Sequence, residues 1–105
     1  LELSCSKEFI LDFKHGIETI VGENGVKLSG GQRQRINLAR SFYQNRDFMI
    51  LDEATNELDS ITEEKVLLNL INQKNKTIIV ISHKKNIYNK FDIIYKIDNK
   101  KIHKL

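Results

Sequence analysis

The chain has 105 residues, 40% of them hydrophobic, so it is one domain or part of one, and nothing in its composition suggests disorder. Its net charge of +3 is small and dispersed, which favours a solvated surface over a nucleic-acid groove. No apolar run approaches the roughly 20 residues of a membrane-spanning helix, and a single cysteine, Cys5, excludes an internal disulfide.

The N-terminal third contains a short predicted helix followed by a glycine cluster. Phe9, Ile10 and Phe13 recur at helical spacing, which predicts a helix over about residues 7–14 that ends at Gly16. Four of the five glycines then fall within ten residues. Such clustering indicates a backbone that turns or approaches another group closely. The four are Gly22, Gly25, Gly30 and Gly31.

A longer amphipathic helix is predicted from about Ser29 to Gln44. Ser29 as N-cap and Gln32 three residues later form a capping box. The apolar residues that follow recur with a period of 3.6, which gives the helix one face suited to a core. They are Ile36, Leu38, Ala39, Phe42 and Tyr43.

Two apolar runs predict strands that are buried on both faces, at residues 48–51 and 77–81. Between them, Ser60 and Glu63 predict a second capping box. The helix that it opens should turn its apolar side chains inward, namely Leu67, Leu70 and Ile71. The order strand, helix, strand implies a parallel sheet covered by helices.

The C-terminal part predicts a short helix and a hairpin. The helix lies near residues 85–90, and the hairpin strands lie at residues 93–97 and 101–103. The turn between them is Asp98-Asn99-Lys100, in which Asn99 can adopt the positive φ that glycine usually supplies.

Polar residues stand directly after both predicted parallel strands, where open α/β sheets bind ligands. Asp52 and Glu53 follow the first strand. Asp52 suits Mg²⁺, which takes one or two carboxylates, and Glu53 suits a general base that accepts a proton from water. His83 follows the second strand and suits a contact to a phosphate oxygen. An exposed strand end and a surface histidine are the alternatives that these residues alone leave open.

Ser29-Gly30-Gly31 opens the longer helix with two residues that disfavour helices by about 1 kcal/mol each relative to alanine. Glycines are suitable there if bare backbone N–H groups meet an anion, with the Ser29 hydroxyl as a further donor. A plain turn with an N-cap is the alternative.

Taken together and in this order, these segments resemble the motifs of ABC ATPases. Leu28-Ser29-Gly30-Gly31-Gln32 matches the LSGGQ signature, and residues 48–53 are similar to a Walker B strand with its catalytic glutamate. Residues 54–59 resemble the D-loop, and residues 81–83 resemble the switch-histidine segment. The segment from Thr19 to Gly25 is similar to the X-loop of ABC exporters.

The resemblance implies a fold and a function. The fold is α/β, a partial P-loop NTPase-like domain with a mostly parallel sheet flanked by helices and part of the helical signature subdomain. Residues 1–45 would form the helical signature region, and residues 46–105 would run from Walker B to the C-terminal sheet. The function is ATP binding and hydrolysis that power membrane transport in an exporter.

The resemblance also implies roles for single residues. Asp52 would support Mg²⁺, Glu53 would polarise the attacking water and His83 would contact the γ-phosphate. The signature residues contact the γ-phosphate of ATP held by a second nucleotide-binding domain in a head-to-tail dimer, and Asp59 couples the two sites. These signature residues are Ser29, Gly30, Gly31 and Gln32.

The implied partners are that second domain and a transmembrane domain. The residues from Thr19 to Gly25, and Glu23 in particular, would face the transmembrane domain. The chain would meet the membrane only through the transmembrane domain, on the cytoplasmic face of the inner membrane. No nucleic acid is expected.

Two departures from the family stand out. Glu57 occupies a position where the D-loop usually has a small residue. The Walker A loop, the Q-loop glutamine and the base-stacking aromatic lie upstream of the signature in the family, and no G-x-x-x-x-G-K-[ST] occurs here. Since the chain opens on Leu1, we expect a piece of a longer protein. Without the Walker A loop, which holds the β- and γ-phosphates, we expect the chain alone to bind ATP very weakly and not to hydrolyse it.

Two other functions stay open at this point. A partial domain that acts only by interaction is compatible with the missing Walker A loop. An ABC ATPase of the DNA-repair or chromosome type has similar motifs, but the segment from Thr19 to Gly25 and the lack of heptads before the signature speak against it.

Overall fold

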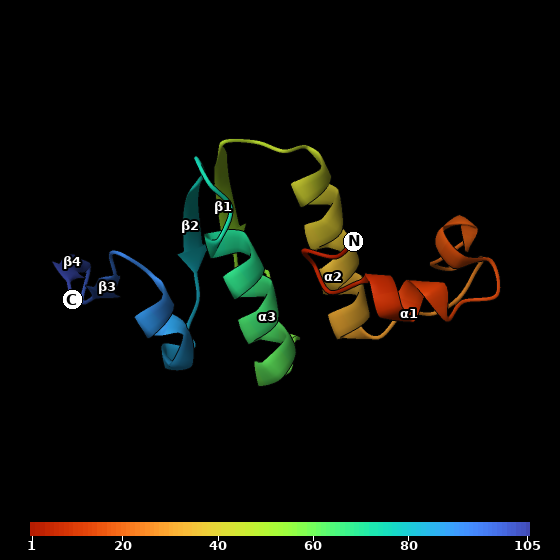
Figure 1. Cartoon of the computed structure of the whole chain (residues 1–105). Coiled ribbons are helices and arrows are strands. Elements are labelled where there is room, and N and C mark those ends of the chain that lie inside the picture. The colour runs from red at the N-terminus through yellow and green to blue at the C-terminus, as the bar shows by residue number, and fades with distance from the viewer.

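The fold is organised around two parallel strands with two helices on one side (Figure 1). The computed structural model describes all residues, 1–105. In chain order the elements are α1 (Lys7–Leu11), the 3-10 turn η1 (Gly16–Glu18), α2 (Gly30–Tyr43), β1 (Phe48–Asp52), α3 (Ser60–Ile71), β2 (Thr77–Ile81), the 3-10 helix η2 (Lys85–Lys90), β3 (Tyr95–Asp98) and β4 (Lys101–Lys104). None of the helices combines the length and the hydropathy that a membrane span requires.

Strands β1 and β2 pair in parallel, as predicted. The register runs from Phe48 opposite Thr77 to Asp52 opposite Ile81. Parallel pairing needs a crossover connection, which α3 provides. The carboxyl ends of both strands therefore lie at one edge of the sheet.

The core lies between this sheet and the helices α2 and α3. Leu38 of α2, Met49 and Leu51 of β1 and Val66 and Leu70 of α3 are all buried, and Leu58 completes the cluster. Ile78 and Val80 of β2 pack against it. Figure 1 shows α3 beside the sheet and α2 beyond it.

The prediction that both strands are buried on both faces was wrong. Phe48 and Ile50 of β1 are 54% and 57% exposed, and Ile79 and Ile81 of β2 are 44% and 48% exposed. Side chains alternate across a strand, so these four share the face opposite the core. Both helices cover the other face, and no element of the chain packs on this one.

The predicted capping box of α2 is confirmed, but of the predicted apolar face only Leu38 is buried, and Tyr43 at the end of the helix is 91% exposed. Ser29 is the N-cap, its hydroxyl accepts from the Gln32 N–H and the Gln32 side chain accepts from the Ser29 N–H. Arg35 on this helix donates to the Cys5 carbonyl at 2.9 Å and lies 4.6 Å from the centroid of the Phe9 ring. These contacts attach the N-terminal segment to α2.

The prediction of a capping box formed by Ser60 and Glu63 was wrong. Asp59, not Ser60, is the N-cap of α3, because its carboxylate accepts the Thr62 N–H at 2.9 Å. Glu63 does not cap the helix and is buried at 1% exposure. The inward face consists of Glu63, Val66, Leu67 and Leu70, whereas Ile71 closes the helix and is 37% exposed.

Both ends of the chain follow the prediction with shifted boundaries. Helix α1 ends at Leu11 rather than near residue 14, and Gly16, with φ of 51°, begins η1. The predicted C-terminal hairpin is present, but β3 begins at Tyr95 rather than Ile93. Asn99 and Lys100 have φ of 46° and 60°, the two positive values of a type I′ turn. The hairpin stands apart at one end of the molecule (Figure 1).

Candidate functional site

Glu53 and His83 meet at the edge where β1 and β2 end. The backbone N–H of Glu53 donates to the Ile81 carbonyl at 2.9 Å, which extends the parallel ladder by one step. His83 Nε2 then lies 2.8 Å from Glu53 Oε1. Two residues separated by 30 positions in the sequence are brought together because both follow parallel strands in register.

The carboxylate of Glu53 is held at both oxygens. Asn56 Nδ2 donates to Oε2 at 2.9 Å, while His83 lies against Oε1. Glu53 adopts φ of 49°, a left-handed conformation that is uncommon for a residue with a side chain. Strained backbone of this kind clusters at functional sites. The side chain remains 43% exposed, so the oriented carboxylate is open to water and can accept a proton from it.

Asp52 presents a carboxylate without an internal partner. It is the last residue of β1, it is exposed, and its side chain makes no hydrogen bond or ion pair. No group of three His, Cys, Asp or Glu side chains in the chain is arranged to hold a metal ion. A free single carboxylate nevertheless fits Mg²⁺, which completes its shell with water and phosphate oxygens.

The start of α2 offers unpaired donors. The backbone N–H groups of Gly30 and Gly31 donate to no acceptor in the chain. Ser29 keeps its hydroxyl proton available because the hydroxyl only accepts from Gln32. The Gln32 side chain is engaged with the Ser29 backbone and shapes this first turn. The arrangement suits an anion, since the positive end of the helix dipole lies here.

The segment after β1 lies against this helix start. A hollow of about 390 Å³ has Ser29, Gly30 and Gly31 on one side and Glu57 and Asp59 on the other. The Glu57 carboxylate occupies the space that a Cβ of Gly30 would fill, and the Glu57 carbonyl lies 3.1 Å from the Cβ position of Gly31. Gln34 Oε1 accepts the Glu57 N–H at 2.9 Å. A Cβ at Gly31 would therefore press on the Glu57 backbone, whereas a Cβ at Gly30 would displace only the flexible, exposed Glu57 side chain.

Asp59 caps helix α3, a structural role that the sequence analysis did not predict. Its Oδ1 accepts the Thr62 N–H at 2.9 Å, and its Oδ2 accepts the Thr62 hydroxyl at 2.6 Å. The hydroxyl of Thr62 and then its backbone N–H lower the pKa of the Asp59 carboxyl below its ordinary value. Asp59 remains exposed on the same hollow, so capping leaves it accessible.

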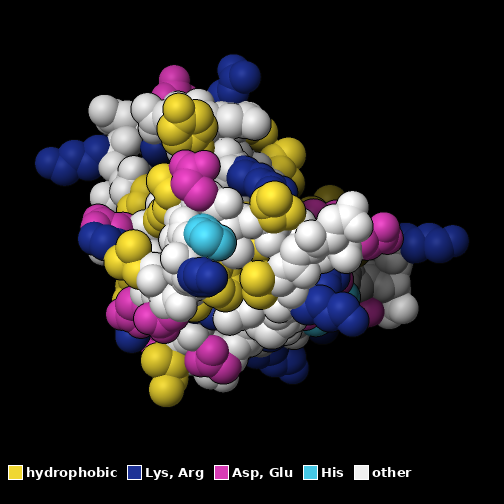
Figure 2. Space-filling model, turned by 90° about the vertical axis from the view of Figure 1, so that its right-hand side faces the viewer, with side chains coloured by type: hydrophobic (Ala, Val, Ile, Leu, Met, Phe, Trp, Pro, Cys, Tyr) yellow, Lys and Arg dark blue, Asp and Glu magenta, His cyan; other side chains and the backbone are white.

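The segment from Thr19 to Gly25 lies apart from the Glu53–His83 pair, at the opposite end from the hairpin (Figure 1). It forms a turn in which the Val26 N–H donates to the Ile20 carbonyl at 2.9 Å. Gly25 leaves no room for a Cβ against that carbonyl. Glu23 is exposed at the turn. Figure 2 shows this end of the molecule, where hydrophobic, acidic and basic side chains are interspersed.

Several residues near the site were not singled out from the sequence. Asn56 follows Glu53 by three positions, a spacing that suits a local side-chain hydrogen bond. Thr55 and Glu63 are buried and form a polar cluster with Lys84, whose side chain is 30% exposed, and no local pattern indicates this cluster. The only feature of the sequence that could have indicated Lys84 is its position next to His83.

Comparison with known proteins shows that the chain is similar to part of ABC transporters. The family model described as ABC transporter matches residues 9–56. The "ATP-dependent lipid A-core flippase" of Vibrio vulnificus (strain YJ016) is 46% identical over 99 residues, which cover 93% of this chain and 17% of the relative. The protein of the same name from Pasteurella multocida (strain Pm70) is 46% identical over 96 residues, which cover 90% and 16%. The chain thus spans about a sixth of the length of these relatives.

A solved structure shares the fold. The bacterial Atm1-family ABC exporter with ATP bound superposes with a TM-score of 0.82 at 34% identity, over 93% of this chain and 17% of that one. The parallel strands with helices on one side therefore match part of an ABC exporter.

Proposed function

Because this chain belongs to the ABC transporter family, we propose that it is the C-terminal part of an exporter-type nucleotide-binding domain and that it takes part in the ATP binding and hydrolysis that drive membrane transport. The observation that carries the proposal is the contact of 2.8 Å between His83 and Glu53 at the carboxyl end of two parallel strands. A non-catalytic module or a chromosome-type ATPase has no comparable support.

Glu53 is the general base in this proposal. Its carboxylate would accept a proton from the water that attacks the γ-phosphate. Asn56 and His83 hold its two oxygens at 2.9 and 2.8 Å, which fixes the orientation of the carboxylate before the substrate arrives. His83, 88% exposed, can also donate to a phosphate oxygen beside it.

Asp52 is the residue that would hold Mg²⁺. The bound ion would offset the negative charge of the phosphate oxygens. Asp52 follows Leu51 of the core cluster, so its backbone is anchored while its carboxylate stays free.

The signature residues would act on nucleotide held by a second nucleotide-binding domain. Ser29, Gly30 and Gly31 present a hydroxyl and two free N–H groups at the exposed start of α2, where a phosphate can approach from outside the chain. Gln32 supports this turn through the Ser29 backbone. Asp59 lies on the same hollow and would take part in coupling the two sites.

The transmembrane partner would meet the turn from Thr19 to Gly25. This turn lies away from the Glu53–His83 pair and carries the exposed Glu23 and Ile20. Its mixed surface suits a contact between domains. We also propose that the domain lies on the cytoplasmic face of the inner membrane. The names of the similar proteins, a flippase and an exporter, support a role in export.

Substituting Glu53→Gln in the full-length protein tests the proposal. ATP turnover should fall by roughly 10²–10⁴-fold, because the amide cannot accept the proton, while ATP binding should persist. Steady-state ATPase rates and equilibrium binding of labelled ATP measure the two quantities. Glu8→Gln, at an exposed glutamate without a side-chain partner, is the control and should keep the normal rate. Unchanged turnover in Glu53→Gln would remove Glu53 from this role.

A further inference from the structure

A buried carboxylate behind the site has no part in the chemistry proposed above. Glu63 of α3 is 1% exposed, and both of its oxygens are engaged. The Thr55 hydroxyl donates to Oε1 at 2.7 Å, and Lys84 Nζ donates to Oε2 at 3.1 Å. A buried charge is costly unless it is paired and hydrogen-bonded in this way.

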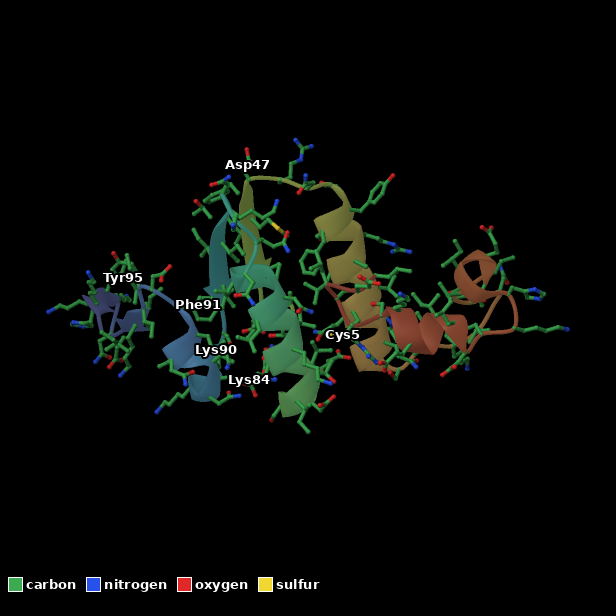
Figure 3. The ribbon with its side chains drawn as sticks, viewed as in Figure 1. Cys5, Asp47, Lys84, Lys90, Phe91 and Tyr95 are labelled. Atoms are coloured by element: carbon green, nitrogen blue, oxygen red, sulfur yellow. The ribbon has the colours of Figure 1, made fainter.

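Lys84 makes more contacts than the ion pair requires. Its Nζ also donates to the Thr55 carbonyl at 3.2 Å and to the Leu58 carbonyl at 3.3 Å. An ammonium group has three N–H donors, so all of them are used. Figure 3 labels Lys84, which reaches from the segment after β2 toward the N-terminal half of α3.

Two members of the cluster of Thr55, Glu63 and Lys84 are close in sequence to Glu53 and His83. Lys84 follows His83 directly, and Thr55 follows Glu53 by two residues. The ammonium group therefore joins the chain just after His83 to the chain just after Glu53, and Glu63 anchors both to α3. We propose that Lys84 and Glu63 are positioning residues, which set the distance between His83 and the general base and hold the residue 55–58 segment that faces the signature.

The proposal rests on the proposed function and extends it to residues that touch no substrate. The bonds to the Thr55 and Leu58 carbonyls tie the segment after Glu53 to the residue after His83, so the cluster does more than pair two charges. Misplacing a catalytic group by about 1 Å can cost about 10²-fold in rate. Loosening the cluster should therefore lower kcat while ATP affinity stays near normal.

The experiment compares variants of the full-length protein. Lys84→Met removes the ammonium group and leaves Glu63 buried and unpaired. The double variant Lys84→Met with Glu63→Gln removes both charges at similar volume, so it should recover the melting temperature. Lys85→Met is the matched control, since Lys85 is an exposed neighbour without a side-chain partner. ATPase kinetics, thermal melting and hydrogen exchange of residues 54–59 and 82–84 are measured for each.

We expect kcat to fall roughly ten- to a hundredfold in Lys84→Met and in the double variant, with KM for ATP within about threefold of normal. Exchange of both segments should accelerate about tenfold in the double variant, and Lys85→Met should match the unaltered protein. Recovery of kcat together with the melting temperature in the double variant would show a purely structural role and overturn the proposal. If Lys84→Met does not fold, the double variant decides alone.

Failure of the proposed function gives a different pattern. In that case Glu53→Gln leaves ATP turnover unchanged, while the exchange rates of residues 54–59 and 82–84 still report whether the cluster holds these segments. Normal exchange in the double variant overturns the positioning role whatever the turnover.

Discussion

At the residue scale, Glu57 places a negative charge beside the proposed phosphate site. Its carboxylate lies over Gly30, in the first turn of α2, and its N–H is held by Gln34. A phosphate that approached Gly30 and Gly31 would meet this charge or displace it. The side chain is exposed, so the repulsion is modest.

Substituting Glu57→Ala should therefore increase the apparent affinity for ATP. In the full-length protein we expect KM for ATP to fall roughly two- to fivefold, the range that an exposed charge interaction supports. Glu64→Ala removes an exposed glutamate of α3 that pairs with Lys90 instead, and it should leave KM unchanged. ATPase rates over a range of ATP concentrations measure the effect. A higher KM in Glu57→Ala would mean that this carboxylate supports nucleotide binding.

Glu53 and His83 could be predicted from the sequence, whereas the contacts of Lys84 behind them could not. Glu53 and His83 each follow an apolar strand, so a local pattern indicates both. Lys84 reaches carbonyls 26 and 29 residues earlier in the chain, and no local pattern encodes such a bond.

At the scale of elements, hydrogen bonds at helix starts set the boundaries. Ser29 and Gln32 satisfy each other's backbone N–H groups, as the capping-box pattern predicts. At α3 the same pattern was misread, because Asp59 precedes Ser60 and its carboxylate takes both the N–H and the hydroxyl of Thr62. Two candidate caps in adjacent positions cannot be separated by pattern alone.

The Asp59 cap predicts a dependence of α3 stability on pH. The pKa of Asp59 is lowered in the folded state, chiefly by the Thr62 hydroxyl. Its contribution to stability is therefore complete above the unfolded pKa of about 3.9 and is lost as the pH falls through the folded value. Asp59→Asn keeps a capping oxygen but does not titrate. Its melting temperature should be lower than that of the unaltered domain at pH 7, and the difference between the two melting temperatures should narrow below about pH 4.

Thermal unfolding of the complete nucleotide-binding domain at a series of pH values measures this gap. Lys7 also lowers the pKa of Glu2. Protonation of Glu2 in acid destabilises the unaltered domain and Asp59→Asn equally, so it does not change the difference between their melting temperatures. A gap of constant size from pH 7 to pH 3 would contradict the assignment of the titration to Asp59.

At the scale of the whole molecule, one face of the parallel sheet is open. Phe48, Ile50, Ile79 and Ile81 form an apolar face with no cover from the chain, and the outer edges of β1 and β2 are unpaired. Exposed apolar faces and free strand edges both promote association.

The 105 residues on their own should therefore self-associate. Sedimentation velocity at increasing concentration should show oligomers, and Ile50→Lys should reduce them by charging the open face. Ile61→Lys, at an exposed isoleucine of α3 away from this face, is the control and should associate like the unaltered chain. A monomer at all concentrations, or equal association of both variants, would contradict the prediction.

The sequence by itself determined the N-cap of α2 and the candidate residues Asp52, Glu53 and His83, because each depends on a pattern within a few residues. The order of strand, helix and strand along the chain determined the parallel pairing. Only the tertiary structure decided which sheet face is open, how Glu57 lies on Gly30 and how Lys84 joins Thr55 to Glu63. These depend on contacts between side chains distant in sequence, and such contacts exist only once the chain has packed.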